Sequence, residues 1–586
     1  MMLILSIHVT ASFCQKADKY TMIEAIDGSQ GQIVVDKEAY GGHYVQQFGA
    51  YQPMFSCPLP ATGDSWVIWA RFKDVNLQIK GLAADGTQKE FNWEWQQPDE
   101  WSWVSFGRHT RAELGTGILL MRGPTAGSTP GLDAVVFAND DSFNPSIDIP
   151  APVVNYPPIT ISVDWRKTIA KASPLSYGLN AFGGFSPDIT HNASYEANMA
   201  EMDVGLLRLH NWGMMNDSAT DATGWIDYKT KQWDAAKIGK DLTGAYAYGP
   251  TLLINIPSWP SWMDKDGMLD IHQQDTFAKF CAELVKIVNK DLHLHVAYWE
   301  ITNERDGLYY GDFHDNGGAL VDHAKPDHLD DLIALYNKCA TAMKAVDPSI
   351  KTGGPADQRP DWNDFIARFV SGTAGHLDFF SYHEYASGSK DDSDKHILDR
   401  AMSFGPDASR IKLIINKIIP HGQVPLFLDE YNISWSSDNR DPRMGSAKGA
   451  VFDALAIVSA IENGVSATTA WNEKDGIYGK MDDSYNLRPG AALFGLLNKR
   501  MVGDVVAASS SEPLAIVPYA VRRSNGAQAL LLINRSSHNR SVILVSESSK
   551  LKLFSVIANS QDPKLAKQST SIIIPAYSVA LFLSGN

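Results

Sequence analysis

The chain has 586 residues, more than one ordinary domain contains, so two or three domains are expected. Its 44% hydrophobic and 20% charged residues are those of a globular protein and exclude a disordered one. The formal net charge is −16 and there is no long basic run, which excludes nucleic acid and anionic membranes as expected partners.

Residues 1–19 form a signal-like segment. Their apolar run, MMLILSIHVTASFC, is like the core of a signal peptide and is too short to span a bilayer. It lacks a basic start, and the junction at Cys14 is a poor lipoprotein cleavage site. We still expect export, hence a secreted, periplasmic or cell-surface protein. No later apolar stretch is long enough for a transmembrane helix, so no membrane insertion is expected.

The four cysteines do not predict a disulfide framework or a metal site, because none has the required spacing. Cys281 and Cys339 fall in helical patterns, and we expect them to be buried as small apolar residues. The sequence leaves the oligomeric state open.

Residues 20–149 have the pattern of an all-β sandwich: short strands, glycine and proline punctuation, and almost no helical periodicity. Ser65–Phe72 and Asn76–Gly81 are predicted strands. The segment is rich in tryptophan, and its candidate platforms for sugar rings are Trp93, Trp95, Trp101 and Trp103. The alternative is that these tryptophans face the core. Residues 150–158 contain four prolines and are predicted to be a linker.

From residue 159 onward short apolar runs alternate with helical stretches, which predicts a parallel sheet built from β-α units. Eight such runs within residues 175–500 indicate a (β/α)8 barrel. The runs are Leu175–Phe182, Gly205–Trp212, Thr251–Ile256, Ala297–Thr302, Lys351–Pro355, Asp378–Tyr385, Pro425–Asn432 and Ser466–Asn472. The predicted helices include Thr276–Asn289 (capped by Asp275), Leu329–Val346, Trp362–Ser371 and Ala447–Asn463.

Short β-rich runs return in residues 501–586 and predict a C-terminal β-sandwich beside the barrel. Residues 159–174 are expected to be a strand that joins this sandwich before the barrel begins. The expected fold is therefore a TIM barrel flanked by an N-terminal β-sandwich of the jelly-roll kind and a C-terminal β-sandwich.

Two glutamates follow strands of the predicted barrel. Glu304 comes after the fourth run and Glu430 ends the seventh, so both belong at the face where barrel active sites lie. A pair of carboxylates placed there supplies the proton donor and the nucleophile of glycoside hydrolysis. Strand alternation predicts Glu300 as a buried support below Glu304, and predicts that Asp429 faces away from Glu430.

The residues around these glutamates resemble those of known enzymes. Trp299-Glu300-Ile301-Thr302-Asn303-Glu304 is similar to the Trp-Glu-x-x-Asn-Glu motif of the retaining glycosidases of clan A, and Phe427–Asn432 is similar to their nucleophile strand. The resemblance implies that Glu304 is the acid/base and Glu430 the nucleophile. As a proton donor near neutral pH, Glu304 is expected to have a raised pKa.

Further site residues follow from the same resemblance or from positions at strand ends. The expected substrate-binding residues are Arg208, His210, Asn211, Asn303, His383, Tyr385 and Trp471, with Trp259 and Trp262 as candidates for the wall of the cleft. Ile159–Asn180 resembles the entry segment of glycoside hydrolase families 39, 51 and 79, and family 39 is favoured.

The N-terminal segment resembles carbohydrate-binding modules of families 6 and 35 in three stretches: Ile23–Ala25, Tyr40–Val45 and Gly131–Val135. In those modules an early Glu and a late Asp hold a structural calcium ion. The resemblance therefore implies a calcium site formed by Glu24 and Asp133.

The expected function is that of a retaining, β-xylosidase-like glycoside hydrolase acting on plant or algal poly- or oligosaccharides, with no cofactor for catalysis. The alternatives are an α-L-arabinofuranosidase or arabinobiosidase, an endo-glycanase of the same clan, or a non-catalytic carbohydrate-binding protein. Sequence does not separate exo from endo action.

Overall fold

The computed structural model describes residues 16–17, 19–150, 152, 156–183, 187–219, 224–246, 249–311, 327–419, 424–438, 440–545, 550–558, 567–568 and 571–584. Almost all of the signal-like segment, including Cys14, and part of the predicted linker lie outside these ranges. The chain divides into two compact units, residues 1–156 with 391–396 and residues 157–390 with 397–586, and each is treated by itself.

The first unit contains a nine-stranded antiparallel sheet whose two long strands are β6 (Ser65–Leu82) and β9 (Gly117–Ala138). The other strands are β1 (Lys16–Ala17), β2 (Tyr20–Glu24), β3 (Gln32–Val35), β4 (His43–Gln46), β5 (Pro53–Pro58), β7 (Gln88–Glu94) and β8 (Ser102–Thr110). The two strands predicted for 65–72 and 76–81 are one continuous strand, because Lys73 and Val75 stay paired with β9. The alternating inward residues of β6, such as Trp66, Ile68 and Phe72, form the core.

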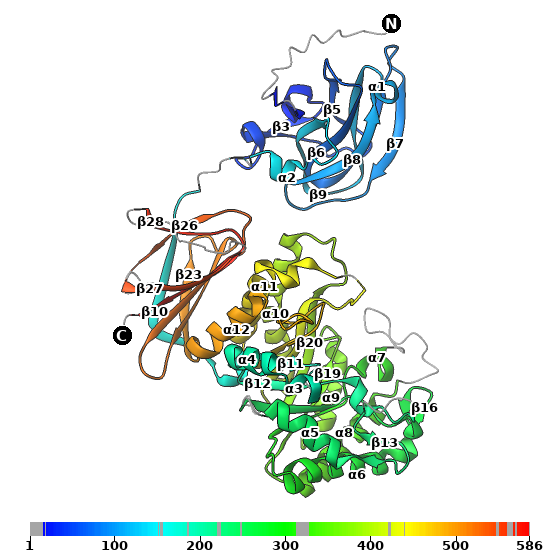
Figure 1. Cartoon of the computed structure of the whole chain (residues 1–586), viewed down its shortest axis with the longest axis vertical. Helices are drawn as coiled ribbons and strands as arrows, with labels where there is room; N and C mark the ends of the chain where they lie inside the picture. The colour runs from blue at the N-terminus through cyan, green and yellow to red at the C-terminus, as the bar shows by residue number, and fades with distance from the viewer. Residues whose placement is uncertain are drawn as a thin grey trace. The chain divides into compact units, whose positions relative to one another are not determined.

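The second unit contains the closed parallel barrel that the sequence predicts (Figure 1). Its strands are β11 (Gly178–Ala181), β12 (Leu206–Leu209), β15 (Thr251–Ile256), β18 (Tyr298–Ile301), β19 (Lys351–Asp357), β20 (Phe379–Ser387), β21 (Leu426–Ser434) and β22 (Val465–Ala470). Each of the eight predicted runs overlaps one of them, and β19, β20 and β21 extend two residues beyond the predicted ends. Their carboxyl ends open on one face of the barrel, where the candidate site lies.

The helices around the barrel include α4 (Ala193–Met202), α5 (Ala235–Tyr246), α6 (Gln274–Val285), α8 (Leu329–Val346), α9 (Asn363–Thr373), α10 (Asp394–Ile418), α11 (Ala447–Glu462) and α12 (Pro489–Arg500). Helix α8 begins and ends where its apolar periodicity predicts. Asp275 does not cap α6 as expected, since the N-cap is Gln273 and the Asp275 carboxylate lies 2.8 Å from the Lys338 ammonium. Cys281 and Cys339 are buried, as predicted.

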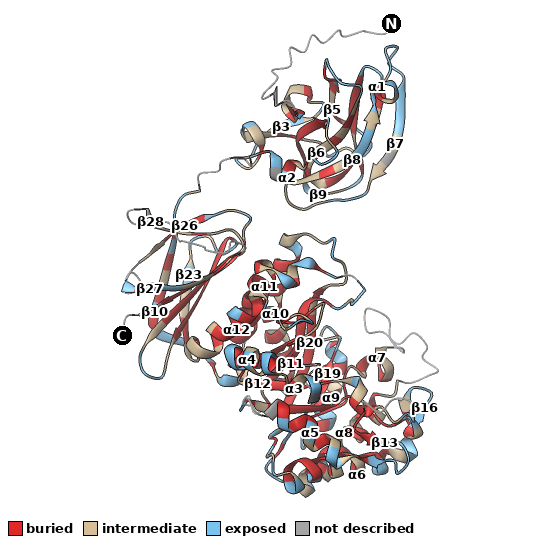
Figure 2. Ribbon diagram, in the orientation of Figure 1, coloured by how far each residue is buried: buried red, intermediate tan, exposed pale blue. Residues whose placement is uncertain are grey.

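The C-terminal sheet packs against the barrel with a shared core. Strand β10 (Ile159–Ala172) lies inside this sheet, between β23 (Gly503–Ser510) and β26 (Arg540–Leu544). The remaining strands are β24 (Ile516–Arg522), β25 (Gln528–Asn534), β27 (Lys552–Ile557), β28 (Lys567–Gln568), β29 (Ser571–Ile574) and β30 (Ser578–Leu583). Helix α11 contacts both the barrel and this sheet and is buried along most of its length (Figure 2).

No helix in the described ranges combines the length and apolar character needed to cross a bilayer.

Candidate active site

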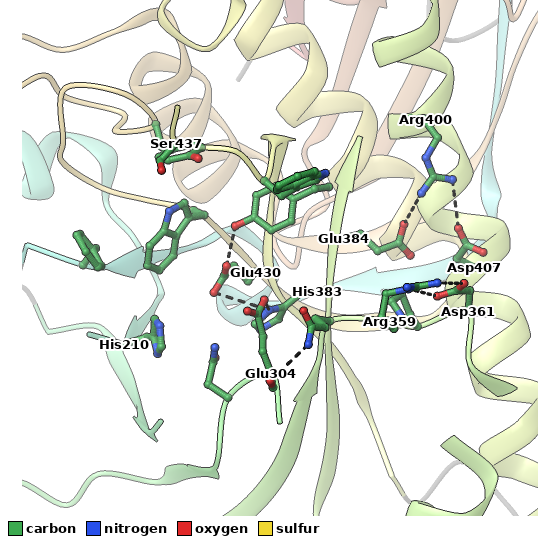
Figure 3. A pocket seen from close by; sticks show the side chains of 18 of the residues that line it. His210, Glu304, Arg359, Asp361, His383, Glu384, Arg400, Asp407, Glu430 and Ser437 are labelled. Carbon is green, nitrogen blue, oxygen red and sulfur yellow. Dashed lines mark hydrogen bonds and ion pairs between the residues drawn. The ribbon is translucent and has the colours of Figure 1, made fainter. Parts of the chain in front are cut away.

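Three strands bring Glu304, His383 and Glu430 together (Figure 3). Glu304 follows β18, His383 lies in β20 and Glu430 lies in β21, and one side-chain nitrogen or oxygen from each falls within 4.8 Å of the others. Retaining glycosidases place their two carboxyl groups about 5–5.5 Å apart, whereas inverting enzymes need about 6.5–9.5 Å. The spacing of Glu304 and Glu430 therefore matches a double displacement.

The backbone after β18 is held in an uncommon conformation. Thr302 has φ 67° and Glu304 has φ 52°, in the left-handed region that side chains other than glycine rarely adopt. The Glu304 N–H donates to the Ala356 carbonyl of β19 at 3.0 Å, which fixes this turn. Strain of this kind is found where surrounding contacts hold a functional side chain in place.

The acid predicted at Glu304 shares a proton with a histidine. His383 Nδ1 donates to Glu304 Oε1 at 2.7 Å. Burial raises the pKa of Glu304, but this hydrogen bond and the charges of His383, His210 and Arg208 lower it more, so the net shift is downward. Burial lowers the pKa of His383, yet the charges of Glu430 and Glu304 raise it above its ordinary value. The expected upward shift of Glu304 was therefore wrong for the free protein, because the imidazole holds the proton.

The nucleophile predicted at Glu430 is held by two donors. The Tyr385 hydroxyl donates to Glu430 Oε1 at 2.6 Å, and Arg208 donates to Oε2 at 3.2 Å. Burial raises the pKa of Glu430 despite the opposing charges of His383 and Arg208. The two donors orient one carboxylate oxygen each.

Arg208 lies beneath the cavity rather than in its wall. It is fully buried and donates to Glu300 at 2.9 Å, to Asn180 at 2.9 Å and to Asn303 at 2.6 Å as well as to Glu430. Arg208 therefore does not line the cavity as a substrate-binding residue would, but it holds Glu430, as the sequence also led us to expect, together with Asn303.

Asp429 does not face away from Glu430, as strand alternation predicts. The ladders on both sides of β21 are irregular at this point. As a result Asp429 lies 3.4 Å from the Arg208 Nε and 3.5 Å from the His383 Nε2. A bulge breaks the two-residue period, so two neighbouring carboxyl groups reach the same buried network.

Glu300 is the buried support that the sequence predicts, and it is ionised. Burial raises its pKa, but Arg208 and the Asp429 carboxyl lower it to about 2. Burial and the Glu300 charge raise the pKa of Asp429 well above its ordinary value. Asp429 is therefore neutral beside an anionic Glu300.

The glutamate pair opens into a cavity of about 850 Å³. Of the predicted binding residues, His210, Asn303, His383, Tyr385 and Trp471 line it. Aromatic wall residues that the sequence reasoning missed are Phe182, Trp212, Trp435 and Tyr478. Trp212 ends the second predicted run and Trp435 follows the seventh, so the sequence could have indicated both as residues at the active-site face.

Besides Arg208, three predicted binding residues do not line the cavity. Trp259 packs in the core and donates to Asp264 at 3.0 Å, and Trp262 packs against the same core beside Phe280. Asn211 caps the turn that follows β12, where its Oδ1 accepts from the Gly213 N–H at 2.7 Å. These side chains support the walls from behind.

The calcium site implied for Glu24 and Asp133 does not fit the arrangement in the first unit. Asp133 is fully buried, one of its oxygens is paired with the Arg71 guanidinium, and the other accepts from the Tyr40 N–H at 2.9 Å. An arginine therefore already supplies the positive charge beside Asp133. In the described part of the chain, the group of His and carboxylate side chains close enough to hold an ion is Glu304, His383 and Glu430.

Comparison with known proteins finds similarity to one family of glycoside hydrolases. The model of the family described as glycosyl hydrolases family 39 matches residues 317–501, a stretch that contains Glu430 and His383 but not Glu304. The chain resembles glycoside hydrolase family 39. Two curated β-xylosidases are similar to this family 39-like chain. That of Caldicellulosiruptor saccharolyticus is 27% identical over 173 residues, and that of Geobacillus stearothermophilus is 28% identical over 176 residues. These matches cover 29% and 28% of this chain and 34% of each relative, so the chain spans about a third of the relatives' length.

Solved structures share the fold of the family 39-like barrel and its C-terminal sheet. A family 39 β-xylosidase from Caulobacter crescentus superposes with a TM-score of 0.52 at 17% identity, covering 73% of this chain and 100% of that one. A family 51 α-L-arabinofuranosidase from Bifidobacterium longum superposes with a TM-score of 0.54 at 14% identity, covering 74% and 100%. At these identities the likeness shows the fold alone.

Proposed function

We propose that the chain is a retaining, β-xylosidase-like glycoside hydrolase that acts on plant or algal oligo- or polysaccharides. The observation that carries the proposal is the spacing of Glu304 and Glu430, which both line a cavity of about 850 Å³. Family 39 similarity supports a β-xylosyl group as the sugar that is transferred.

The first step needs the proton on Glu304. In the free protein the proton rests on His383, but the Glu304 side chain is 31% exposed and the His383 side chain 1%. A bound sugar removes the remaining water from Glu304, and desolvation favours the neutral carboxylic acid. The proton then passes from His383 Nδ1 to Glu304 Oε1 along their hydrogen bond, leaving a neutral imidazole.

Glu430 then attacks the anomeric carbon while Glu304 protonates the departing oxygen, which forms a glycosyl ester and breaks the glycosidic bond. Esterification removes the negative charge of Glu430, which lowers the pKa of Glu304 and keeps Glu304 ionised after it has given up its proton. The Glu304 carboxylate then acts as a general base and takes a proton from water. The resulting hydroxide equivalent attacks the same carbon and releases Glu430. Asn303, held by Arg208, is placed to hydrogen-bond the sugar 2-hydroxyl, a contact that strengthens in the transition state.

A panel of aryl glycosides tests this function. We expect turnover of an aryl β-xyloside, with NMR of the first product showing retained configuration before mutarotation. A first product of inverted configuration would overturn the double displacement. Turnover of an aryl α-L-arabinofuranoside alone would leave the proposed mechanism in place and identify the transferred sugar as arabinofuranose instead of xylose.

We further propose that the first unit binds glycan through an exposed aromatic group. Tyr51 and Trp95 are 58% and 66% exposed, and Trp93 lies between them with ring centroids 5.9 Å and 6.0 Å away. Exposed aromatic faces of this extent mark binding surfaces. Trp101 and Trp103 are less suited, because cations cover the first and the second packs against the core.

Depletion from solution by insoluble xylan and cellulose tests this surface. Trp95→Ala should reduce the bound fraction while Trp103→Phe leaves it unchanged, and equal binding by wild type and Trp95→Ala would contradict the assignment.

Export of the chain is a separate proposal that rests on the apolar run at residues 1–14. It predicts that the mature protein recovered from the exterior of its native cell begins after that run.

A further inference from the structure

The cavity continues beyond the glutamate pair into a second part that the mechanism above does not use. Six charged side chains line this part, which is called the charged lobe: Arg359, Asp361, Glu384, Arg400, Asp407 and Arg410. Helix α10 supplies three of them and the end of β20 supplies Glu384. Figure 3 shows the lobe on the opposite side of Glu304 and Glu430 from His210.

The charged lobe lies where a leaving group must extend. In the proposed function Asn303 contacts the transferred sugar, and His210, a further predicted binding residue, lies across Glu304 from the lobe in Figure 3. Gln358, next to Arg359, also lines the cavity and donates to the Glu304 carbonyl at 3.4 Å. Because Glu304 protonates the departing oxygen, the residue attached to that oxygen continues past Glu304 toward Arg359 and Glu384.

Two groups in the lobe lack strong partners of opposite charge. Glu384 is 4% exposed, its Oε1 has no hydrogen-bond partner among the described residues, and its Oε2 meets Arg400 only at 3.4 Å. Arg400 donates to the Ser403 hydroxyl at 2.6 Å, but its carboxylate contacts are 3.4 Å and 3.7 Å long, against about 2.7–2.9 Å for a charge-assisted hydrogen bond.

The other two arginines of the lobe are well paired. Arg359 holds Asp361 through two hydrogen bonds of 3.0 Å and 2.9 Å. Arg410 donates to Asn363 at 2.6 Å and to Asp407 at 3.1 Å. Arg400 is therefore the guanidinium of the lobe that lacks a close carboxylate partner.

The charge of the lobe selects the kind of ligand. Burial and the charge of Asp407 raise the pKa of Glu384 well above its ordinary value, so Glu384 is neutral and can donate a hydrogen bond. Three guanidinium groups then face two carboxylates, Asp361 and Asp407, which leaves one positive charge. A ligand that accepts from both Arg400 and protonated Glu384 and neutralises this charge is a carboxylate. A neutral sugar supplies hydroxyl groups but leaves the charge unbalanced.

We propose that the charged lobe binds an acidic sugar, a uronate, as the leaving group, with its carboxylate held by Arg400 and Glu384. The inference rests on the proposed function and names its substrate class. The enzyme would then release a neutral sugar from the position next to a uronate in an acidic oligosaccharide.

A matched pair of substrates tests the proposal: a disaccharide of the transferred sugar linked to a uronate, and the same disaccharide with the carboxylate converted to its amide. One charge-assisted hydrogen bond changes affinity by about 10- to 100-fold, so wild type should prefer the uronate by at least about 10-fold in kcat/KM. Arg400→Gln should abolish that preference by lowering kcat/KM for the uronate to the value for the amide.

Arg368→Gln is the control, because its side chain is 35% exposed against 38% for Arg400 and is also ion-paired, but it does not line the cavity. It should keep the wild-type preference. If Arg400→Gln fails to fold, inhibition of wild-type aryl glycoside turnover by free glucuronate and by glucuronamide replaces it, with stronger inhibition by the glucuronate expected. Equal rates on the matched pair, or equal inhibition, would overturn the proposal. Failure of wild type on every aryl glycoside would instead overturn the function on which it rests.

Discussion

At the scale of single residues, the site keeps one proton among three groups: Glu304, His383 and Glu430. The reactive form holds that proton and leaves Glu430 ionised. The pKa of Glu430 is raised from its ordinary value of 4.5, so as the pH falls Glu430 becomes protonated, and unable to attack, already above pH 4.5. The pKa of His383 is raised from 6.5, so the shared proton stays bound as the pH rises past that value.

The pH dependence of kcat/KM should therefore be bell-shaped, with its acidic limb above pH 4.5 and its basic limb above pH 6.5. In His383→Gln a carboxyl group must carry the shared proton in place of the imidazole, so the basic limb should move to lower pH. The exposed His272 provides a control, and His272→Gln should leave both limbs in place. A basic limb that does not move in His383→Gln would show that another group holds the proton.

Alanine substitution of the two glutamates should lower the hydrolysis rate in different ways: the loss depends on the leaving group for Glu304 and is independent of it for Glu430. Glu304→Ala removes the proton donor, so hydrolysis of natural glycans should fall by about 10²–10⁴-fold. A dinitrophenyl glycoside needs little protonation and should still form the glycosyl ester, which accumulates and is released by azide with retained configuration. Glu430→Ala should stop both substrates. If Glu304→Ala hydrolyses natural glycan at nearly the wild-type rate, Glu304 is not the acid.

At the scale of the elements, the bulge in β21 brings Asp429 and Glu430 together into one buried network around Arg208. Arg208 lies between the ionised Glu300 and Glu430, whereas Asp429 is neutral. Asp429→Asn keeps the size and neutrality of the side chain and should cost less than about 1 kcal/mol of unfolding free energy. Arg208→Gln leaves two buried carboxylates without their cation and should cost about 3–5 kcal/mol. Chemical denaturation measures both, and a larger loss in Asp429→Asn would mean that Asp429 is charged.

The barrel strands were predictable because each is a short apolar run, and β15 and α8 have the bounds that their patterns predict. Glu304 and Glu430 were predictable because Glu304 closely follows the apolar run of β18 and Glu430 lies in the apolar run of β21. Sequence could not place Asp429, since alternation assumes a regular strand and the bulge depends on pairing with both neighbours. It also could not assign Trp259 to the core, or gather Arg400 and Glu384 into one lobe, because both depend on how helices and loops pack after the barrel closes.

At the scale of the whole molecule, the barrel and the C-terminal sheet form one compact unit with a shared core. The Tyr177 hydroxyl, at the start of the barrel, donates to the Met501 carbonyl at 2.7 Å and lies 3.0 Å from the Tyr519 hydroxyl of β24. Both tyrosines are fully buried, and the barrel core continues into the C-terminal sheet through Val505, Leu531 and Val579. Strand β10 joins them, because it precedes the barrel in sequence and lies inside the sheet.

Two truncations separate the units of the chain. A protein that begins at Pro157 keeps β10 and should retain the wild-type kcat/KM on an aryl glycoside, because the cavity is lined by residues of the second unit. A protein that begins at Leu175 lacks β10, which leaves β23 and β26 without their shared neighbour. It also exposes the buried residues of the C-terminal sheet that share a core cluster with Ile161 and Trp165. It should be insoluble or show no cooperative thermal transition. Normal folding of the shorter protein would show that the barrel does not need the C-terminal sheet, and loss of aryl glycoside turnover in the longer one would show that the first unit shapes the cleft.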